Sequence, residues 1–173
     1  MEKDLNLQIA LLVEAQAKLF GLQTVMVRSE DVSTENGIAV QTVSRKVADM
    51  KNRLQLMHNY PNGIFVSIHQ NKYTTSQPNG TQVFYAPKIS QAEVLAECIQ
   101  SSVSGGLQPQ NHRSIKPGTK DTYLLYNAPI PAVIVECGFM SHPQELEQLK
   151  NKNYQQQMAL SIVTGILYYN TLQ

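Results

Sequence analysis

The sequence predicts a single α/β domain in which a mostly parallel or mixed central sheet carries helices on both faces. The length of 173 residues fits one domain, and an apolar fraction of 42% is enough for a hydrophobic core. Segments with the pattern of strands also alternate along the chain with segments at helical spacing. We therefore treat residues 1–173 as one domain.

Two apolar runs that end in reactive side chains predict where the site lies. Residues 64–71, Ile-Phe-Val-Ser-Ile-His-Gln-Asn, follow a turn and have the pattern of a buried strand that ends at His69 and Asn71. Residues 132–139 have the same form and contain Glu136. Ligands bind at the carboxyl ends of strands in α/β sheets, so we expect His69 and Glu136 to share one site. A histidine placed there can bind a metal or move a proton.

The first half of the chain alternates between helical and extended patterns. Apolar residues at helical spacing predict a helix from Leu5 to Leu19, which Gly21 ends. Residues 24–27 have the pattern of a short strand, and residues 29–41 that of a polar loop. A second amphipathic helix is expected over residues 43–57, before the strand at 64–71.

The second half continues the alternation. We expect a surface loop at 72–80, a strand at 81–85 and a helix over 92–99 that Gly105 and Gly106 stop. Residues 107–121 form a long irregular segment, and residues 122–126 have the pattern of a short strand. After the strand at 132–139 come a short helix and a last helix, whose apolar face carries Met158, Ile162, Ile166 and Tyr169.

Charge and composition argue against several classes of function. The net charge is +1 with no block of like charges, which argues against nucleic acid as a partner. No stretch is long and apolar enough to span a bilayer, and no glycine-rich phosphate loop is present.

Cys98 and Cys137 are expected to be small buried hydrophobic residues. The chain shows no signal peptide; its start has the pattern of a helix entry, which fits a cytosolic protein or a chain shortened at its N-terminus.

Three separate segments resemble one family. They are Glu-Lys-Asp-Leu-Asn-Leu at 2–7, Ser-Ile-His-Gln-Asn at 67–71 and Pro-Ala-Val-Ile-Val-Glu-Cys-Gly-Phe at 131–139. Together they resemble the zinc-dependent N-acetylmuramoyl-L-alanine amidases (amidase type 3), and most of all the branch that acts on the spore cortex in germination. Residues 27–31, 111–117 and 138–145 also resemble segments of this family, so the likeness covers essentially the whole chain.

The resemblance implies a site and a reaction. Glu2 and His69 are expected to bind Zn²⁺, and Glu136 to be the catalytic carboxylate. The bond cut would join the lactyl group of N-acetylmuramic acid to L-alanine of the stem peptide. The chemistry is coherent because a catalytic zinc takes three protein ligands and a water, lowers the pKa of that water and polarises a carbonyl. A nearby carboxylate can then take a proton and return it to the leaving amine.

One departure from the family pattern limits this expectation. The family's first strand, which carries its first histidine ligand, has no counterpart here, and His58, His112 and His142 match no ligand position. We therefore expect an N-terminally truncated amidase domain, with a phosphorylase/hydrolase-like fold that lacks the first strand. It would be inactive or far weaker than a complete enzyme. The alternative is a non-catalytic fragment that binds cell-wall material or a partner protein.

The zinc and catalytic residues each have an ordinary structural interpretation as well. A histidine at a strand end is often only hydrogen-bonded, and an acidic residue such as Glu2 is favoured in the first turn of any helix. Glu136 could form a buried salt bridge, because a buried carboxylate without a partner is costly. The three motifs favour the catalytic interpretation.

Substrate contacts are expected from three further residues. Arg113 and Lys116 can hold the anionic stem peptide, or they can be solvated charges of a loop. Asn71 can touch substrate or brace the turn after His69, and the structural role is favoured. The resemblance also implies peptidoglycan as substrate, a homo-oligomer or an activating partner protein, and a place in the extracellular cell wall or spore cortex.

Overall fold

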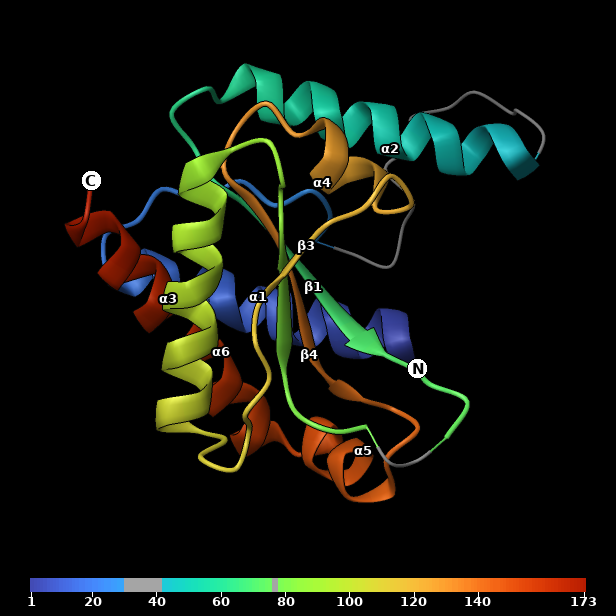
Figure 1. The fold of residues 1–173 in the computed structure, drawn as a ribbon, viewed down its shortest axis with the longest axis vertical. Coiled ribbons are helices and arrows are strands. Elements are labelled where there is room, and N and C mark those ends of the chain that lie inside the picture. The colour runs from blue at the N-terminus through green and yellow to red at the C-terminus, as the bar shows by residue number, and fades with distance from the viewer. Residues whose placement is uncertain (30–41, 76–77) are drawn as a thin grey trace.

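The computed structural model describes residues 1–29, 42–75 and 78–173 (Figure 1). It is a single α/β unit, as predicted. In chain order its elements are α1 (Glu2–Leu19), α2 (Thr42–Asn59), β1 (Phe65–Asn71), β2 (Gln82–Tyr85), α3 (Ser90–Gly106), β3 (Lys116–Pro117), α4 (Tyr123–Asn127), β4 (Ala132–Phe139), α5 (Pro143–Lys150) and α6 (Lys152–Thr171). Within these ranges no helix is both long and apolar enough to cross a membrane.

The sheet is mixed, in the order β1-β4-β2-β3. β1 and β4 run parallel, β4 and β2 antiparallel, and β2 and β3 parallel. β1 therefore lies at the edge of the sheet among the described strands. The two long strands that the sequence predicts, β1 and β4, lie side by side.

Helices cover both faces of the sheet, as predicted (Figure 1). On one face, α1, α3 and α6 share one hydrophobic core with Val133 and Val135 of β4, and α3 packs directly against this strand. On the other face, α4 packs against β4, α2 packs against α4, and both helices share a core with Ala132 and the partly buried Ile134. Alternate residues of β4 therefore belong to two different cores, and both faces of the strand are buried. Cys98 and Cys137 are buried free thiols, which confirms their expected place.

Two predicted strands are wrong. Residues 123–126 form most of the short helix α4, and the Tyr126 amide donates to the carbonyl of Thr122, the N-cap residue, at 3.0 Å. Leu125 of this helix is buried in the same core as Ala128, which follows the end of the helix. A short apolar run does not distinguish the two structures, and packing under α2 decides it here.

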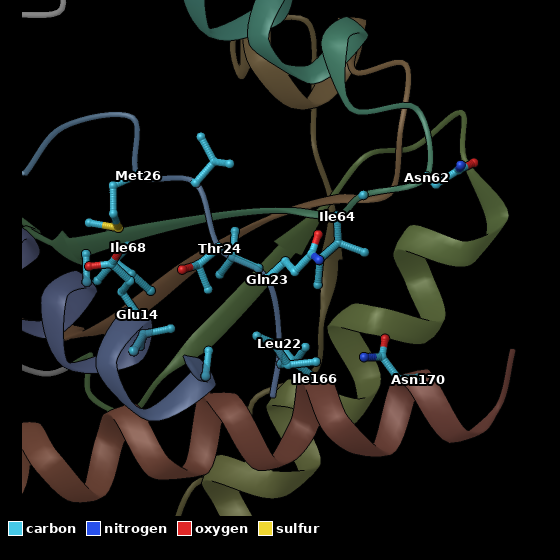
Figure 2. A pocket seen from close by; sticks show the side chains of 16 residues that line it. Glu14, Leu22, Gln23, Thr24, Met26, Asn62, Ile64, Ile68, Ile166 and Asn170 are labelled. Atoms are coloured by element: carbon cyan, nitrogen blue, oxygen red, sulfur yellow. The ribbon is translucent and has the colours of Figure 1, made fainter. Parts of the chain in front are cut away.

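Residues 24–27 do not form a strand either. The segment is anchored at both ends: the Leu22 amide donates to the Ala17 carbonyl at 3.0 Å, and Arg28 donates to the Lys3 carbonyl at 2.8 Å. It forms no strand of the described sheet, although residues 22–26 line the same hollow as Ile64, Val66 and Ile68 of the β1 segment (Figure 2). Most of the loop predicted at 29–41 lies outside the described residues.

The apolar face predicted for the first helix is only partly buried. Leu5 and Ile9 of α1 reach the core, whereas Leu19 at its end is 85% exposed. The chain turns two residues later, at Gly21 with a φ of +80°. In contrast, all four residues of the face predicted for the last helix are buried in α6.

The close approach of α3 and α6 at Gly165 gives a stability prediction. A Cβ atom at Gly165 would lie 2.6 Å from the Ile99 Cα atom and 2.8 Å from the Cys98 carbonyl oxygen. We expect Gly165→Ala to lower the free energy of unfolding by about 1–3 kcal/mol, because two helix backbones must move apart. Urea denaturation measures this change.

Gly105→Ala is the matched control, because this glycine is also helical and has open space around its Cβ position. Alanine there favours the helix, so stability should be unchanged or slightly higher. Equal losses in the two variants would contradict the packing argument.

Candidate active site

Pairing of β1 with β4 brings the two predicted reactive side chains together. His69 of β1 lies directly opposite Glu136 of β4 in the parallel register. Residues paired in this way point to the same face of the sheet, so the imidazole and the carboxylate are neighbours. Both stand near the carboxyl ends of their strands, as the two apolar runs predict.

Glu2 joins them from the start of α1. Its Oε1 atom lies 3.7 Å from the His69 Nδ1 atom, and both side chains are little more than two-fifths exposed. α1 begins near the carboxyl end of β1, as the position of the N-terminus shows (Figure 1). The first turn of a helix and the end of an edge strand therefore meet at the predicted site.

Glu2, His69 and Glu136 form a cluster, in which Glu136 has a buried oxygen without a hydrogen bond from the described residues. Its Oε2 atom is buried and has no hydrogen-bond partner among the residues that the structure describes. Burial, followed by the negative charge of Glu2, raises the pKa of Glu136 to about 7. A carboxyl group that exchanges its proton near neutral pH is suited to general acid–base chemistry.

His69 is held in the form that can donate a lone pair. Burial lowers the pKa of His69, and this effect outweighs the opposing charge of Glu2. The positive charges of Arg53 and Arg28 lower the pKa further. A neutral imidazole is the form that binds metal ions.

A polar row extends across the sheet from this pair. Gln82 of β2 lies opposite Glu136 on the side away from His69, so three neighbouring strands place His69, Glu136 and Gln82 in line. The Gln82 Oε1 atom accepts a hydrogen bond from Arg113 Nη1 at 2.9 Å, and its amide donates to the Ser114 carbonyl at 2.8 Å. Sequence analysis missed Gln82, because only the register between strands far apart in the chain places it in this row.

Arg113 makes internal contacts rather than pointing freely into solvent. Its Nε atom donates to the Asn79 carbonyl at 2.6 Å, and its guanidinium group lies 4.7 Å from the centre of the Phe139 ring. Together with the bond to Gln82, these contacts hold residues 79–82 and 113 against the end of β4. The Arg113 side chain therefore helps to form the edge of the site at residues 79–82 and Phe139, which we call the rim.

The other two predicted substrate contacts, Asn71 and Lys116, lie at different distances from His69 and Glu136. Asn71 ends β1, and its carbonyl accepts from the Met140 amide at 2.8 Å, which joins the ends of β1 and β4. Lys116 is exposed in β3, opposite Phe84 of β2, two positions after Gln82. Asn71 is thus next to the cluster, and Lys116 is farther across the sheet.

A second buried carboxylate fixes the backbone around the site. Glu145 of α5 is 7% exposed. Its Oε1 atom accepts from the Gly80 amide at 2.8 Å, and its Oε2 atom accepts from the Phe139 amide at 2.9 Å. One side chain therefore links the end of β4 to the loop before β2.

The described residues contain no group of three or more His, Cys, Asp or Glu side chains placed to hold a metal ion. Glu2 and His69 supply two suitable donors. His58 bonds to the Leu54 carbonyl at the end of α2, and His142 accepts from the Glu145 amide at the start of α5. Neither of these histidines belongs to the cluster.

Comparison with known proteins gives a consistent result along the whole chain. Residues 1–168 match the family model described as N-acetylmuramoyl-L-alanine amidase. The germination-specific N-acetylmuramoyl-L-alanine amidase of Bacillus subtilis (strain 168) is 29% identical over 171 residues, which cover 99% of this chain and 71% of that protein.

Two solved structures of amidases are also similar to this chain. The CwlD amidase from Clostridioides difficile, determined in complex with the GerS lipoprotein, superposes with a TM-score of 0.94 at 32% identity, covering 99% of this chain and 87% of that one. The N-acetylmuramoyl-L-alanine amidase from Clostridium difficile 630 superposes with a TM-score of 0.81 at 30% identity, covering 99% of this chain and 84% of that one.

The two hydrogen bonds to Glu145 generate a prediction. In Glu145→Gln only one side-chain oxygen remains to accept a hydrogen bond. The side-chain NH₂ group then faces one of the two backbone amides, Gly80 or Phe139, and this buried amide loses its acceptor. We expect the free energy of unfolding to fall by about 1–3 kcal/mol in urea denaturation. Glu147→Gln, which changes only an exposed pair with Lys150, should shift it by less than about 0.5 kcal/mol. An equally small effect at Glu145 would contradict the proposed link.

Proposed function

The chain belongs to the N-acetylmuramoyl-L-alanine amidase family, and we propose that it hydrolyses the amide bond between N-acetylmuramic acid and L-alanine of the peptidoglycan stem peptide. The observation that carries this proposal is the pairing of His69 with Glu136 on neighbouring strands, beside Glu2. The cluster combines a possible metal ligand with a carboxylate whose pKa is about 7.

Glu136 is proposed as the proton carrier. A carboxylate that accepts a proton from the attacking water must release it to the amine that leaves, because an amide nitrogen leaves only after protonation. A pKa near neutral allows both transfers. The buried, unpartnered Oε2 atom supports this role, since in the described part of the chain nothing else uses that oxygen.

Glu2 and His69 fit as two ligands of a catalytic zinc. The donor types are suitable, and the neutral imidazole has a free lone pair for a metal. Bound zinc would polarise the amide carbonyl and make the attacking water more acidic. Catalytic zinc sites usually have three protein ligands, and the described residues bring together only these two. We therefore propose weak metal binding and weak activity for the chain of residues 1–173.

The rim residues are proposed to receive the substrate. Arg113 bonds to Asn79 and Gln82 and lies over the Phe139 ring, which supports a role in holding this edge of the site in shape. Lys116 is exposed, and its charge can attract the anionic stem peptide. Asn71 lies next to His69 and Glu136 and is within reach of a substrate bound there.

The relatives also support a place of action and a partner. One relative is a germination-specific amidase, and one solved neighbour is bound to a lipoprotein. We propose that this chain acts in the cell wall or spore cortex and has a protein partner.

Zinc content tests the two ligands. After dialysis, the purified chain should hold clearly less than one zinc per chain, and titrated zinc should bind at least about tenfold more weakly in Glu2→Ala and in His69→Ala. Elemental analysis and competition with a chromophoric chelator measure these values. His112→Ala, at an exposed histidine outside the cluster, is the matched control.

A full zinc per chain that both variants lose would mean that the site is already complete. Zinc binding that neither variant weakens would refute the assignment of Glu2 and His69.

Activity tests the role of Glu136. With added zinc, the chain should release free amino groups of L-alanine from purified peptidoglycan slowly, and Glu136→Gln should reduce the rate by at least about a hundredfold. The variant should fold as stably as the parent or more so above pH 7. This follows because the raised pKa means that folding disfavours the ionised form, and glutamine removes that charge.

Glu147→Gln is the control for the activity assay. Unchanged activity in Glu136→Gln would exclude its catalytic role. Firm binding of peptidoglycan by the parent chain with no release at all would favour the non-catalytic alternative.

A further inference from the structure

Arg113 carries a positive charge at the rim that no carboxylate of the described residues neutralises. Its Nε atom donates to the Asn79 carbonyl, its Nη1 atom donates to the Gln82 Oε1 atom, and its guanidinium group lies over the Phe139 ring. All of these partners are neutral, and none of the ion pairs between described residues includes Arg113. The charge is therefore available to an anionic ligand.

The buried carboxylate of Glu145 does not pair with this charge. Its two oxygens accept from the Gly80 and Phe139 amides at 2.8 Å and 2.9 Å. Both N–H groups of Arg113 Nη2 and one of Nη1 have no partner in the part of the chain that the structure describes. Two N–H groups on neighbouring nitrogens of a guanidinium group match the two oxygens of one carboxylate.

The rim holds the guanidinium group in one place. The Arg113 amide donates to the Asn111 Oδ1 atom at 3.0 Å, and the Asn111 side chain donates to the Thr81 carbonyl at 2.8 Å. Gln82, which orients Nη1, is fixed by the pairing of β2 with β4 and by its bond to the Ser114 carbonyl at 2.8 Å. Because the side chain is ordered before a ligand arrives, less conformational entropy is lost on binding.

Arg113 reaches the same face of the sheet as the cluster. Gln82 lies opposite Glu136 in the antiparallel register, and residues paired in this way point to the same face. Paired Cα atoms are about 5 Å apart, and the Gln82 side chain spans the remaining distance to Arg113. The guanidinium group is therefore on the order of 10 Å from Glu136.

The stem peptide has a carboxylate at a matching distance from the scissile bond. Its L-alanine is followed by a glutamate that is linked onward through its side chain, which leaves the α-carboxylate free. Because consecutive Cα atoms are about 3.8 Å apart, this carboxylate lies on the order of 6 Å from the nitrogen of the scissile amide. When that nitrogen is within reach of a proton from Glu136, the carboxylate can therefore reach Arg113.

We propose that Arg113 binds the α-carboxylate of the second stem-peptide residue and that Gln82 is the positioning residue that orients the guanidinium group. This inference rests on the proposed amidase function and deepens it, because it makes the chain selective for stem peptides with a free carboxylate at this place. A peptide in which this carboxylate is an amide would turn N–H groups toward those of Arg113 and bind more weakly. A neutral residue at position 82 leaves the charge of Arg113 to the substrate.

The test compares two soluble ligands that differ in one group. One is N-acetylmuramoyl-L-alanyl-D-glutamate and the other is N-acetylmuramoyl-L-alanyl-D-isoglutamine, each with the side-chain carboxyl of its second residue blocked as a methyl amide. Near neutral pH and without added zinc, isothermal titration calorimetry should show about tenfold tighter binding of the acid to the 173-residue chain. Equal affinities, or no binding of either ligand, would overturn the proposal.

Variants of Arg113 and Gln82 locate the preference. Arg113→Gln should bring the two affinities within about twofold, and Arg113→Lys should keep only part of the preference, because lysine has the charge without the paired N–H groups. Gln82→Glu keeps a side chain that accepts from Arg113 but neutralises its charge, so it should also remove the preference. A role of Arg113 in holding the rim alone would not produce this loss. A preference that survives Arg113→Gln or Gln82→Glu would overturn the proposal.

Lys120→Gln is the matched control, because it removes a positive charge from an exposed side chain and should keep the full preference. Loss of the preference in this variant would mean that the general charge of the surface causes it, which would overturn the role of Arg113.

The outcome is separate from that of the amidase proposal. Release of L-alanine amino groups from peptidoglycan by a chain that binds both ligands equally would overturn this inference alone. A preference that depends on Arg113 and Gln82, in a chain that releases nothing, would count against the amidase reaction and still support the carboxylate site.

Discussion

The parallel pairing of β1 with β4 is the constraint on which the candidate site depends. Phe65 binds the Pro131 carbonyl at one end of the pair, and the Asn71 carbonyl binds the Met140 amide at the other. Between these ends the register places His69 opposite Glu136. A slip of one residue would turn the imidazole to the opposite face, so the apolar residues that fix the register also fix the site.

Glu145 and Glu136 are both buried carboxylates near the ends of β1 and β4, but their hydrogen bonding differs. Glu145 accepts a hydrogen bond on each oxygen and holds two backbone segments. Glu136 has a buried oxygen without a partner in the described structure, and its pKa is raised to about 7. A buried carboxylate whose oxygens all accept hydrogen bonds is typical of a structural role. A buried carboxylate oxygen without a hydrogen bond lowers stability, and such groups are found mainly at functional sites.

The sequence predicts the parts of the fold whose signals are long and local. The runs at 64–71 and 132–139 and the face of α6 have enough residues to identify the element and its burial. Residues 122–126 are too few, and packing under α2 makes them helical. Gln82 could not be predicted as a neighbour of Glu136, because their meeting depends on an antiparallel pairing between strands about fifty residues apart along the chain. The sequence predicts Arg113 as a substrate contact or a solvated loop charge, and it does not predict the internal contacts, because they depend on the same pairing.

The candidate metal site depends on the first turn of α1 as well as on the pairing of β1 with β4. The Glu2 Oε1 atom in this turn lies 3.7 Å from the His69 Nδ1 atom at the end of β1. A metal bound by both side chains would hold the first turn of α1 against the end of β1. Under the proposal for Glu2 and His69, metal binding and the docking of this turn are thermodynamically linked, and each favours the other by the same factor.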